Sequence, residues 1–412
     1  MAVTSGKSLK VRMGCTGWYG TTTFGAAPVS LAGPGQVGYT HPMSPATTLT
    51  PGKPADVGLS AAVLERAAGL LNHALDANRI SAASLTVARH GRLVLSQGFG
   101  AQRPEPGARP IDADSTFLLA SITKPVTASA IMLLVDRGLI SLDDPVQLHI
   151  PEFVGWDKSK IHVRDVLSHI SGMPDMLPQN TRLRQAHAPI SRFVDGAINT
   201  RLLFRPHTDF RYQSKGILLA AEIVERITGQ RLRDFEEQVI FAPLGMTNSF
   251  LGLQGRAIEE LVWCTPSMQQ SAQAERWGQN SPYWRDFGCP WGGMHSTGED
   301  LTVLLNCMLG AGAYGDTRIF SHAAATAMVS DQNPAHLGSP WGIGWALRDS
   351  RVWSFFGEQV SAATFGHVGA TGTVAWADPE SGLSCVCLTN MMVESGALLR
   401  RVSNTVAAAV EG

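Results

Sequence analysis

The stretch LLASITKPVTASAIMLLVDRG, residues 118–138, places a serine and a lysine at the start of an apolar segment. Pro125 is compatible with the first turn of a helix, whose backbone N–H groups have no partners within the helix. Gly138 stands where a left-handed cap is expected to end such a helix. The apolar residues that recur at helical spacing are Val126, Ala130, Leu133 and Leu134. The pattern therefore predicts a buried helix that carries Ser121 near its beginning.

Ser121 and Lys124 form an S-x-x-K pair at the start of this predicted helix. Residues three positions apart share one face of a helix, so the hydroxyl and the amine are neighbours. Burial in so apolar a segment disfavours the charged form of the lysine, and a neutral amine can act as a base toward the hydroxyl. S-x-x-K also arises by chance in a chain of this length, so the other motifs decide its meaning.

Composition excludes several classes of function. The 412 residues include 33 Lys and Arg against 34 Asp and Glu, without a basic run that would attract nucleic acid or a membrane surface. The apolar runs are too short to cross a bilayer, so we expect a soluble protein. The N-terminus lacks the apolar core of a secretory signal, which predicts a cytoplasmic location. Six scattered cysteines lack metal-ligand spacing, and most are expected to be small core residues.

Strand patterns gather at both ends of the chain and helical patterns lie between them. We expect an amphipathic helix from Ser60 to about Asn78, and a hairpin of 84–89 and 92–96 around His90-Gly91. The later expected elements are helices over 162–168, 215–229 and 300–310, strands over 341–345, 363–366, 373–378 and 384–389, and a closing helix over 397–410.

The predicted fold is α/β in the α+β sense. One antiparallel sheet is assembled from residues of about 82–100 and 340–390 and flanked by the N- and C-terminal helices, with a mostly helical domain inserted. The predicted divisions are an N-terminal extension over 1–55, a discontinuous sheet domain over 56–110 and 335–412, and a helical domain over 111–334.

Two further motifs follow in order. Tyr212-Gln213-Ser214 immediately precedes the helix expected at 215, a junction that can aim a phenol into a cleft. His367-Val368-Gly369 lies among glycines on or beside a strand edge, where missing side chains let a ligand approach the backbone. Taken alone, the tyrosine and the histidine are equally compatible with packing roles.

The ordered set of motifs resembles the class C β-lactamase and penicillin-binding-protein superfamily of serine hydrolases, in particular its esterase branch of family VIII-type carboxylesterases. The resemblance covers about residues 57–410 and implies a β-lactamase/transpeptidase-like fold. Other phrases that share it are LLVDRGLISLDDP at 133–145, DVLSHISGM at 165–173, IFAPLGM at 240–246 and GGMHSTGED at 292–300.

The resemblance also implies roles for individual residues. Ser121 would attack a carbonyl to form an acyl-enzyme, with Lys124 and Tyr212 sharing the proton transfers; which of the two deprotonates the serine stays open. We expect the Lys124 ammonium to lower the pKa of the phenol if Tyr212 is the base. The oxyanion would be held by the backbone N–H groups of Ser121 and Ala370. The remaining expected substrate-binding residues are His367, Gly369 and Ser214.

Two departures from the family pattern favour uncharged substrates. His367 stands where β-lactamases and carboxypeptidases have a lysine, which weakens recognition of a substrate carboxylate. Ser214 replaces the usual asparagine and removes an amide. We therefore predict a carboxylesterase for small to medium acyl esters, without a metal or cofactor, whose partner is a small-molecule ester or amide.

Three alternatives stay open. One is a β-lactamase or D-amino-acid peptidase or amidase, another is an acyl transferase, and the third is an inactive relative that binds a ligand. Two other features could shape the cleft: the aromatic pair Trp18-Tyr19 in the extension, and an apolar acyl pocket walled by some of Trp263, Trp277, Trp284, Trp291, Trp341 and Trp345.

Overall fold

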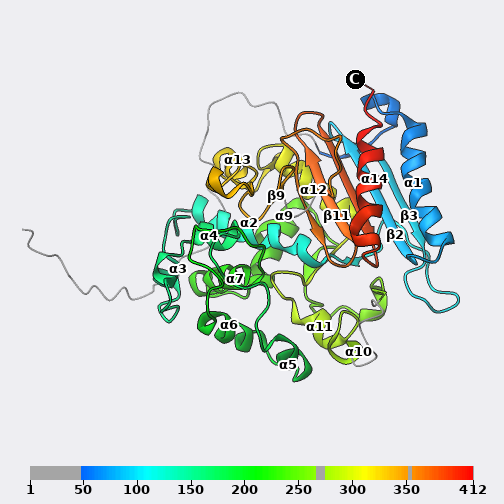
Figure 1. Ribbon diagram of the computed structural model, residues 1–412. Coiled ribbons are helices and arrows are strands. Elements are labelled where there is room, and N and C mark those ends of the chain that lie inside the picture. Colours follow the sequence, from blue (N-terminus) through cyan, green and yellow to red (C-terminus); the bar gives the residue numbers. More distant parts are fainter. Residues whose placement is uncertain (1–47, 266–273, 351–354, 412) are drawn as a thin grey trace, which may run out of the picture. The chain divides into compact units, whose positions relative to one another are not determined.

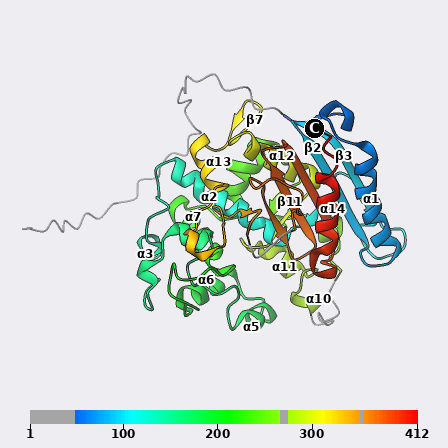
Figure 2. The same ribbon diagram turned by 45° about the horizontal axis from the view of Figure 1, so that its top comes forward.

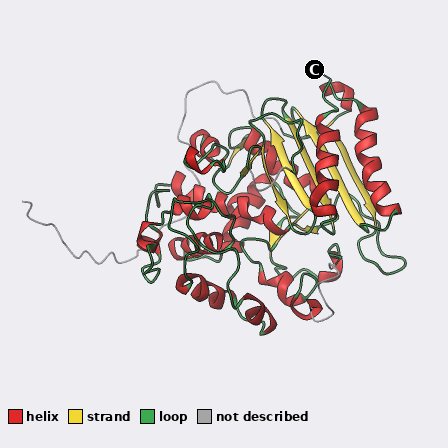
Figure 3. Ribbon diagram, viewed as in Figure 1, coloured by secondary structure: helices red, strands yellow, loops and turns green. Residues whose placement is uncertain are grey.

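A seven-stranded sheet forms the centre of the fold (Figures 1 and 3). The computed structural model describes residues 48–265, 274–350 and 355–411, so Trp18, Tyr19 and Cys15 lie outside the described residues. In spatial order, the strands are β1 (Thr50–Pro51), β3 (Arg92–Gly100), β2 (Ala82–Arg89), β12 (Leu383–Thr389), β11 (Thr373–Asp378), β10 (Phe365–Gly369) and β9 (Ala346–Leu347).

The two ends of the chain meet in the middle of this sheet. β2 and β3 form the predicted hairpin around His90-Gly91, and β12 pairs antiparallel with β2, with Cys385 opposite Val87. The predicted sheet is therefore confirmed. β1 is an addition: it pairs parallel with β3, and the Thr50 N–H donates to the carbonyl of Gly91 at 3.0 Å. Two residues are too few to produce an alternating pattern, so this strand was not predicted.

Helices cover both faces of the sheet (Figures 1 and 2). Side chains alternate along β12: Cys385 and Cys387 pack with helices α1 (Ala61–Asp76) and α14 (Ala397–Ala407), whereas Val386 and Leu388 belong to the core on the opposite face. On that face, α12 (Gly298–Leu309) packs against β2, β11 and β12. The two terminal helices thus flank the sheet as predicted. The five described cysteines are all buried.

Lys124 lies on α2 (Thr123–Asp136), which is buried from Thr123 to Leu134, and Ser121 lies in the short 3-10 helix just before it (Ala120–Ile122). Pro125 falls in the first turn of α2, and Gly138 takes the expected left-handed conformation with φ of +68°. α2 packs against α7 (Lys215–Thr228), α8 (Leu232–Glu236) and α13 (His322–Met328). The remaining helices of this region are α3 (Val146–His149), α4 (Val163–Leu167), α5 (Asn180–Gln185), α6 (Ile190–Asn199), α9 (Ala242–Leu244), α10 (Ala274–Trp277) and α11 (Pro282–Phe287).

Two small sheets complete the described structure. A three-stranded sheet with the order β4 (Phe117–Leu118), β6 (Met294–Ser296) and β5 (Phe250–Leu251) leads the chain into Ser121. β7 (Ala313–Tyr314) and β8 (Thr317–Arg318) form a short hairpin. Across the described residues, every helix is too short or too polar to cross a membrane.

Two strand predictions need correction. The segment 341–345, WGIGW, is a turn rather than a strand, because the Gly342 N–H donates to the Trp345 carbonyl at 2.9 Å and Gly344 has φ of +76°. The alternation of tryptophan and glycine in this segment resembles the sequence pattern of a strand. The strand that pairs with β10 is β9, which begins only after this segment. The strand expected at 363–366 is β10, which starts later and contains the whole His-Val-Gly motif.

Candidate active site

Ser121 lies where a short strand passes almost directly into a buried helix. β4 ends at Leu118, Ala120 has the left-handed φ of +50°, and α2 begins at Thr123. A residue other than glycine at positive φ is strained and is held by its surroundings. Here the Thr123 hydroxyl donates to the Ala120 carbonyl at 2.7 Å and accepts from the Met294 N–H at 3.0 Å. These bonds fix the turn that carries the serine.

Lys124 lies directly against Ser121. Its Nζ donates to the Ser121 Oγ at 3.0 Å and to the Trp291 carbonyl oxygen at 3.0 Å. The side chain is only 1% exposed, and burial lowers the pKa of Lys124 to about 7, although the charge of Asp175 partly opposes this shift. A large fraction of Lys124 is therefore uncharged near neutral pH, as we expected from the sequence.

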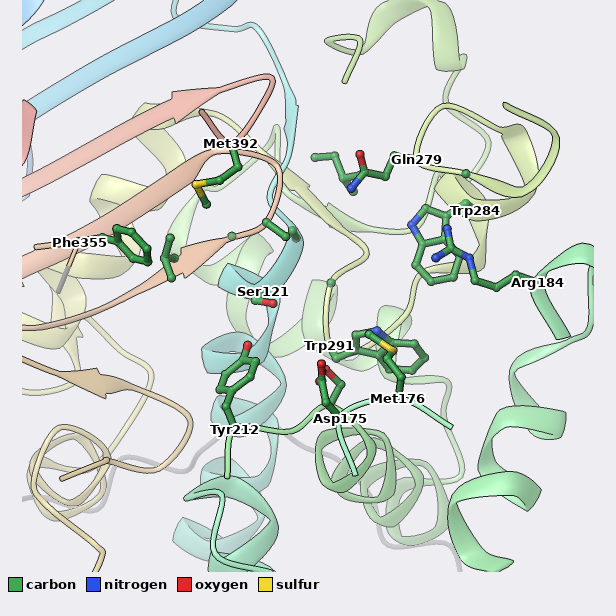
Figure 4. A pocket seen from close by; sticks show the side chains of 18 of the residues that line it. Ser121, Asp175, Met176, Arg184, Tyr212, Gln279, Trp284, Trp291, Phe355 and Met392 are labelled. Carbon is green, nitrogen blue, oxygen red and sulfur yellow. The ribbon is translucent and has the colours of Figure 1, made fainter. Parts of the chain in front are cut away.

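Tyr212, just before α7, points its hydroxyl at Ser121 (Figure 4). The two side chains share a hydrogen bond, and Lys124 Nζ lies 4.7 Å from the centre of the phenol ring. Burial raises the pKa of Tyr212 well above its usual range. The expectation that Lys124 lowers this pKa is thus wrong. Burial removes water from the phenolate and destabilises it more than the hydrogen bond with Ser121 stabilises it.

The third motif contributes backbone rather than a charged side chain. Ala370 and Gly369 line the cavity beside Ser121. His367 is fully buried, is not among the residues that line the cavity, and packs against Tyr212 and Trp341 with ring centres 6.1 and 5.8 Å apart. The expected contact of His367 with substrate stays a prediction, and in this structure the ring packs against the tyrosine. Burial also lowers the pKa of His367 to about 3, so this residue is uncharged near neutral pH.

Gly369 allows another part of the main chain, rather than a ligand, to approach the end of β10 closely. A Cβ atom at this position would lie 2.0 Å from the carbonyl oxygen of Leu119. The hydroxyls of Thr371 and Thr373 donate to the carbonyls of Leu118 and Leu119 at 2.7 and 2.9 Å. The end of β10 is thereby fastened to the strand that leads into the serine. The space that we expected a ligand to occupy is partly filled by this main chain.

Ser214 and Asp175 form a hydrogen-bonded pair in the wall of the cavity. Ser214 is buried and donates from its hydroxyl to Asp175 Oδ1 at 2.6 Å, and both residues line the cavity. Asp175 is exposed and comes from the loop after α4. It was not predicted from the sequence, where only the turn phrase Ser-Gly-Met-Pro before it marks the position. A carboxylate here favours neutral or cationic groups and repels anions.

Lys215, directly after Ser214, is a second buried lysine that sequence reasoning missed. Its Nζ lies 3.5 Å from the centre of the Trp291 ring, the tryptophan whose carbonyl accepts from Lys124. Burial lowers the pKa of Lys215 to about 7, with Cys289 and Asp175 opposing the shift. The signal that could have found it is a lysine on the apolar side of a predicted amphipathic helix.

The cavity beside Ser121 has a volume of about 650 Å³, within the usual range for small-molecule sites. Figure 4 shows Trp291, Asp175 and Met176 on one side of the serine and Phe355 and Met392 on the other. Of the six tryptophans considered from the sequence, Trp277, Trp284 and Trp291 line the cavity, whereas Trp263, Trp341 and Trp345 are not among its lining residues. The guanidinium of Arg184 stacks on Trp284, 3.7 Å from the ring centre.

The part of the chain that the structure describes contains one group of His, Cys and carboxylate side chains close enough to share a metal ion. It consists of His162, Asp165 and His207, none of which lines the cavity.

The site and the fold together can be compared with known proteins. The family model described as Beta-lactamase matches residues 67–408. The chain belongs to the beta-lactamase family. The matched range contains all the predicted site residues, from Ser121 to Ala370, together with the helical region and every strand of the central sheet except β1. This beta-lactamase-family protein is thus a serine hydrolase, and its mixed α/β architecture is the predicted β-lactamase/transpeptidase fold.

Individual relatives of this family member differ in their described activities. A protein of Salmonella agona (strain SL483) named "Putative D-alanyl-D-alanine carboxypeptidase" is 27% identical over 379 residues, which is 83% of this chain and 86% of the relative. A penicillin-binding-protein homologue from Caulobacter crescentus has a TM-score of 0.72 at 20% identity and covers 85% of this chain and 99% of its own. A family VIII carboxylesterase has a TM-score of 0.69 at 20% identity, with coverage of 85% and 99%. The two structures establish the shared fold.

Proposed function

We propose that this protein is a carboxylesterase that forms an acyl-enzyme on Ser121 and acts on esters with small to medium acyl chains. The observation that supports the proposal is that the third motif carries no charge. His367 is buried and neutral, and Ala370, which follows the motif, has no polar side chain. The charged residues among those that line the cavity are Asp175 and Arg184. The guanidinium of Arg184 stacks on Trp284, on the side of the cavity away from Phe355 (Figure 4).

In the proposed acylation step, neutral Lys124 takes the proton of the Ser121 hydroxyl as Oγ attacks the ester carbonyl. The backbone N–H groups of Ser121 and Ala370 stabilise the oxyanion, each contributing about 3–4 kcal/mol. When the bond between the carbonyl carbon and the leaving oxygen breaks, Tyr212 donates its proton to that oxygen and recovers one from the Lys124 ammonium. The result is an acyl-Ser121 ester and a free alcohol, with both lysine and tyrosine returned to their starting states.

In deacylation the same groups act in reverse. Water loses a proton through Tyr212 to Lys124 and attacks the acyl carbonyl, and Ser121 regains its proton as the carboxylic acid leaves. The high pKa of Tyr212 suits this role, because a phenol that stays protonated can pass a proton on but cannot store a negative charge. These considerations favour Lys124 as the base.

The apolar lining supports acyl chains rather than charged peptides as substrates. Trp291 and Met176 lie beside Ser121 on one side and Met392 and Phe355 on the other (Figure 4). Burying an alkyl chain between such side chains contributes about 0.8 kcal/mol per methylene group. We expect kcat/KM to rise with chain length until the chain fills the cavity.

The decisive experiment is intact-protein mass spectrometry after brief exposure to p-nitrophenyl butyrate and, separately, to a penicillin. We expect wild-type protein to release p-nitrophenol and carry a butyryl adduct, and Ser121→Ala to do neither. Ser395→Ala is the matched control, because this serine also lines the cavity and is expected to leave the reaction intact. Equal turnover by Ser121→Ala and wild type contradicts the proposal.

A second candidate is a D-amino-acid peptidase, which the similarity to the Salmonella agona protein favours. In that case a D-alanyl-D-alanine peptide or the penicillin acylates Ser121 faster than the butyrate ester does. If none of these substrates forms an adduct, an inactive relative that binds a ligand is favoured instead.

A further inference from the structure

Two histidines and a buried carboxylate converge outside the residues that line the cavity. Asp165 is 1% exposed, whereas the side chains of His162 and His207 are 35% and 41% exposed. Asp165 Oδ2 lies 2.7 Å from His207 Nε2 and 3.3 Å from His162 Nδ1. One ligand atom from each of the three residues lies within 4.8 Å of the others. The two imidazoles are thus in contact with solvent and the carboxylate is not.

Both histidines occupy positions where other residues are more common. His162 is the N-cap of α4, where Ser, Thr, Asp or Asn is preferred, and it forms a capping box with Asp165, whose Oδ2 accepts from the His162 N–H at 2.7 Å. His207 has φ of +67°, a conformation that glycine adopts without strain. Residues that depart from local preferences cluster at functional positions. Two residues that are uncommon at their positions thus meet on one buried carboxylate.

The donor set fits a borderline divalent metal ion. Two imidazole nitrogens and a carboxylate oxygen are ligands that Zn²⁺ accepts at about 2.0–2.2 Å, which separates the ligand atoms of a tetrahedral site by about 3.3–3.5 Å. The separation of 3.3 Å between His162 Nδ1 and Asp165 Oδ2 already has this value. The two imidazole rings stack with an angle of 3° between their planes, so metal binding requires the partly exposed rings to rotate as well as to shift by about 1 Å.

We propose that His162, Asp165 and His207 bind a Zn²⁺ ion or a similar nitrogen-preferring divalent metal ion, with water from the solvent side completing the coordination. The ion links the start of α4 to the segment that carries Tyr212. That segment already bonds to the loop after α4, through the His207 N–H to the Ile170 carbonyl and the Arg211 N–H to the His169 carbonyl, each at 3.0 Å. The bound ion therefore stabilises the fold around the tyrosine.

The test is isothermal titration of the full chain with ZnCl₂, paired with thermal unfolding. We expect one site that is lost in both His207→Gly and His162→Ser. Each substitution restores the residue that local structure prefers, so both variants are expected to fold. At about a hundredfold excess over Kd, Zn²⁺ should raise the unfolding midpoint of the wild type by about 3–5 °C and leave both variants unchanged.

Two controls separate this site from other sources of binding. His149→Gln removes another histidine paired with a carboxylate, since His149 Nε2 lies 3.0 Å from Asp144 Oδ2, and it should bind Zn²⁺ like the wild type. Ser121→Ala should also bind normally, which keeps the result independent of the esterase proposal. If Zn²⁺ does not bind, or binds equally to both cluster variants, the proposal is overturned and the cluster serves as a hydrogen-bonded helix cap.

Discussion

The Nζ of Lys215 lies 3.5 Å from the centre of the Trp291 ring, on the tryptophan whose carbonyl holds Lys124. The positive charge of Lys215 also lowers the pKa of Lys124. Lys215→Met should therefore raise the pH at which kcat/KM reaches half its maximum. Loss of the contact with Lys215 should also displace Trp291, which positions Lys124, and lower kcat/KM at pH 7 about tenfold. Lys158→Met, which removes another buried lysine, is the control and should leave the midpoint in place. An unchanged midpoint in Lys215→Met means that the residue acts through packing alone.

The pH profile of ester hydrolysis tests Lys124 as the base. Because burial lowers the pKa of Lys124 to about 7, kcat/KM should fall about tenfold per pH unit below that value. Above it the rate should stay level up to alkaline pH, since burial raises the pKa of Tyr212 and keeps the phenol protonated. Measuring initial rates from pH 5 to 9.5, with circular dichroism to confirm folding, checks this. A descending limb near neutral pH speaks against a protonated phenol as proton donor.

Asp175 is predicted to exclude anionic substrates. Its carboxylate lines the cavity and accepts from Ser214 at 2.6 Å. Asp175→Asn keeps the hydrogen bond and removes the charge, which is worth about 1 kcal/mol in a cavity open to water. Acylation by a penicillin should then become about three- to tenfold faster, while a neutral butyrate ester changes much less. High salt should reduce the difference between variant and wild type. If both substrates respond equally, the carboxylate acts on the reacting groups rather than on the substrate charge.

Gly369 should be intolerant of any side chain. In Gly369→Ala the new Cβ would lie 2.0 Å from the Leu119 carbonyl oxygen, which pushes β10 away from the strand before Ser121. We expect a loss of about 1–3 kcal/mol in the free energy of unfolding, and about a hundredfold lower kcat from the displaced oxyanion donor. Urea unfolding and steady-state kinetics measure the two effects. Gly69→Ala on α1, where nothing lies within 4 Å of the new Cβ, should instead stabilise the protein by about 0.5–1 kcal/mol.

Glu236 is a buried acid whose ionisation is predicted to destabilise the fold. Burial raises its pKa from 4.5 to about 8, and the Thr127 hydroxyl donates to it at 3.3 Å. As pH rises through 4.5 the unfolded chain ionises this group but the folded chain does not, so stability is lost until about pH 8. Glu236→Gln should therefore be more stable than wild type at pH 8, by on the order of 1–3 kcal/mol, and gain little at pH 5. Equal effects at both pH values contradict a buried neutral acid.

The sequence was enough to predict the elements with strong periodicity. α2 and α7 have unbroken apolar faces, and the hairpin of β2 and β3 has an unambiguous turn at His90-Gly91, so their positions were predicted closely. Ser121, Lys124 and Tyr212 were found because each belongs to a short motif, and the structure brings them together. WGIGW failed because alternation of large and small residues is shared by strands and glycine turns.

What the sequence could not supply is the environment of each polar group. His367 looked like a ligand-binding residue because glycines surround it, yet Gly369 lies against the main chain of Leu119 and Gly366 against that of Ala375. Asp175 and Lys215 have no motif of their own, and they matter only because folding places them against Ser214 and Trp291. The pKa of Tyr212 depends on how much water its hydroxyl loses, which is a property of packing and not of spacing.

The hydroxyls of Thr371 and Thr373 reach carbonyls that precede them by 253 and 254 positions. Contacts so distant along the chain are entropically costly to close and are expected late in folding. A ribosome-bound or truncated chain that ends before β11 therefore has a complete Ser-Lys pair but no partner strand to set the oxyanion donors. We therefore expect acylation of Ser121 to begin only after the C-terminal strands have docked, when the last tenth of the chain, from β11 onward, has been synthesised.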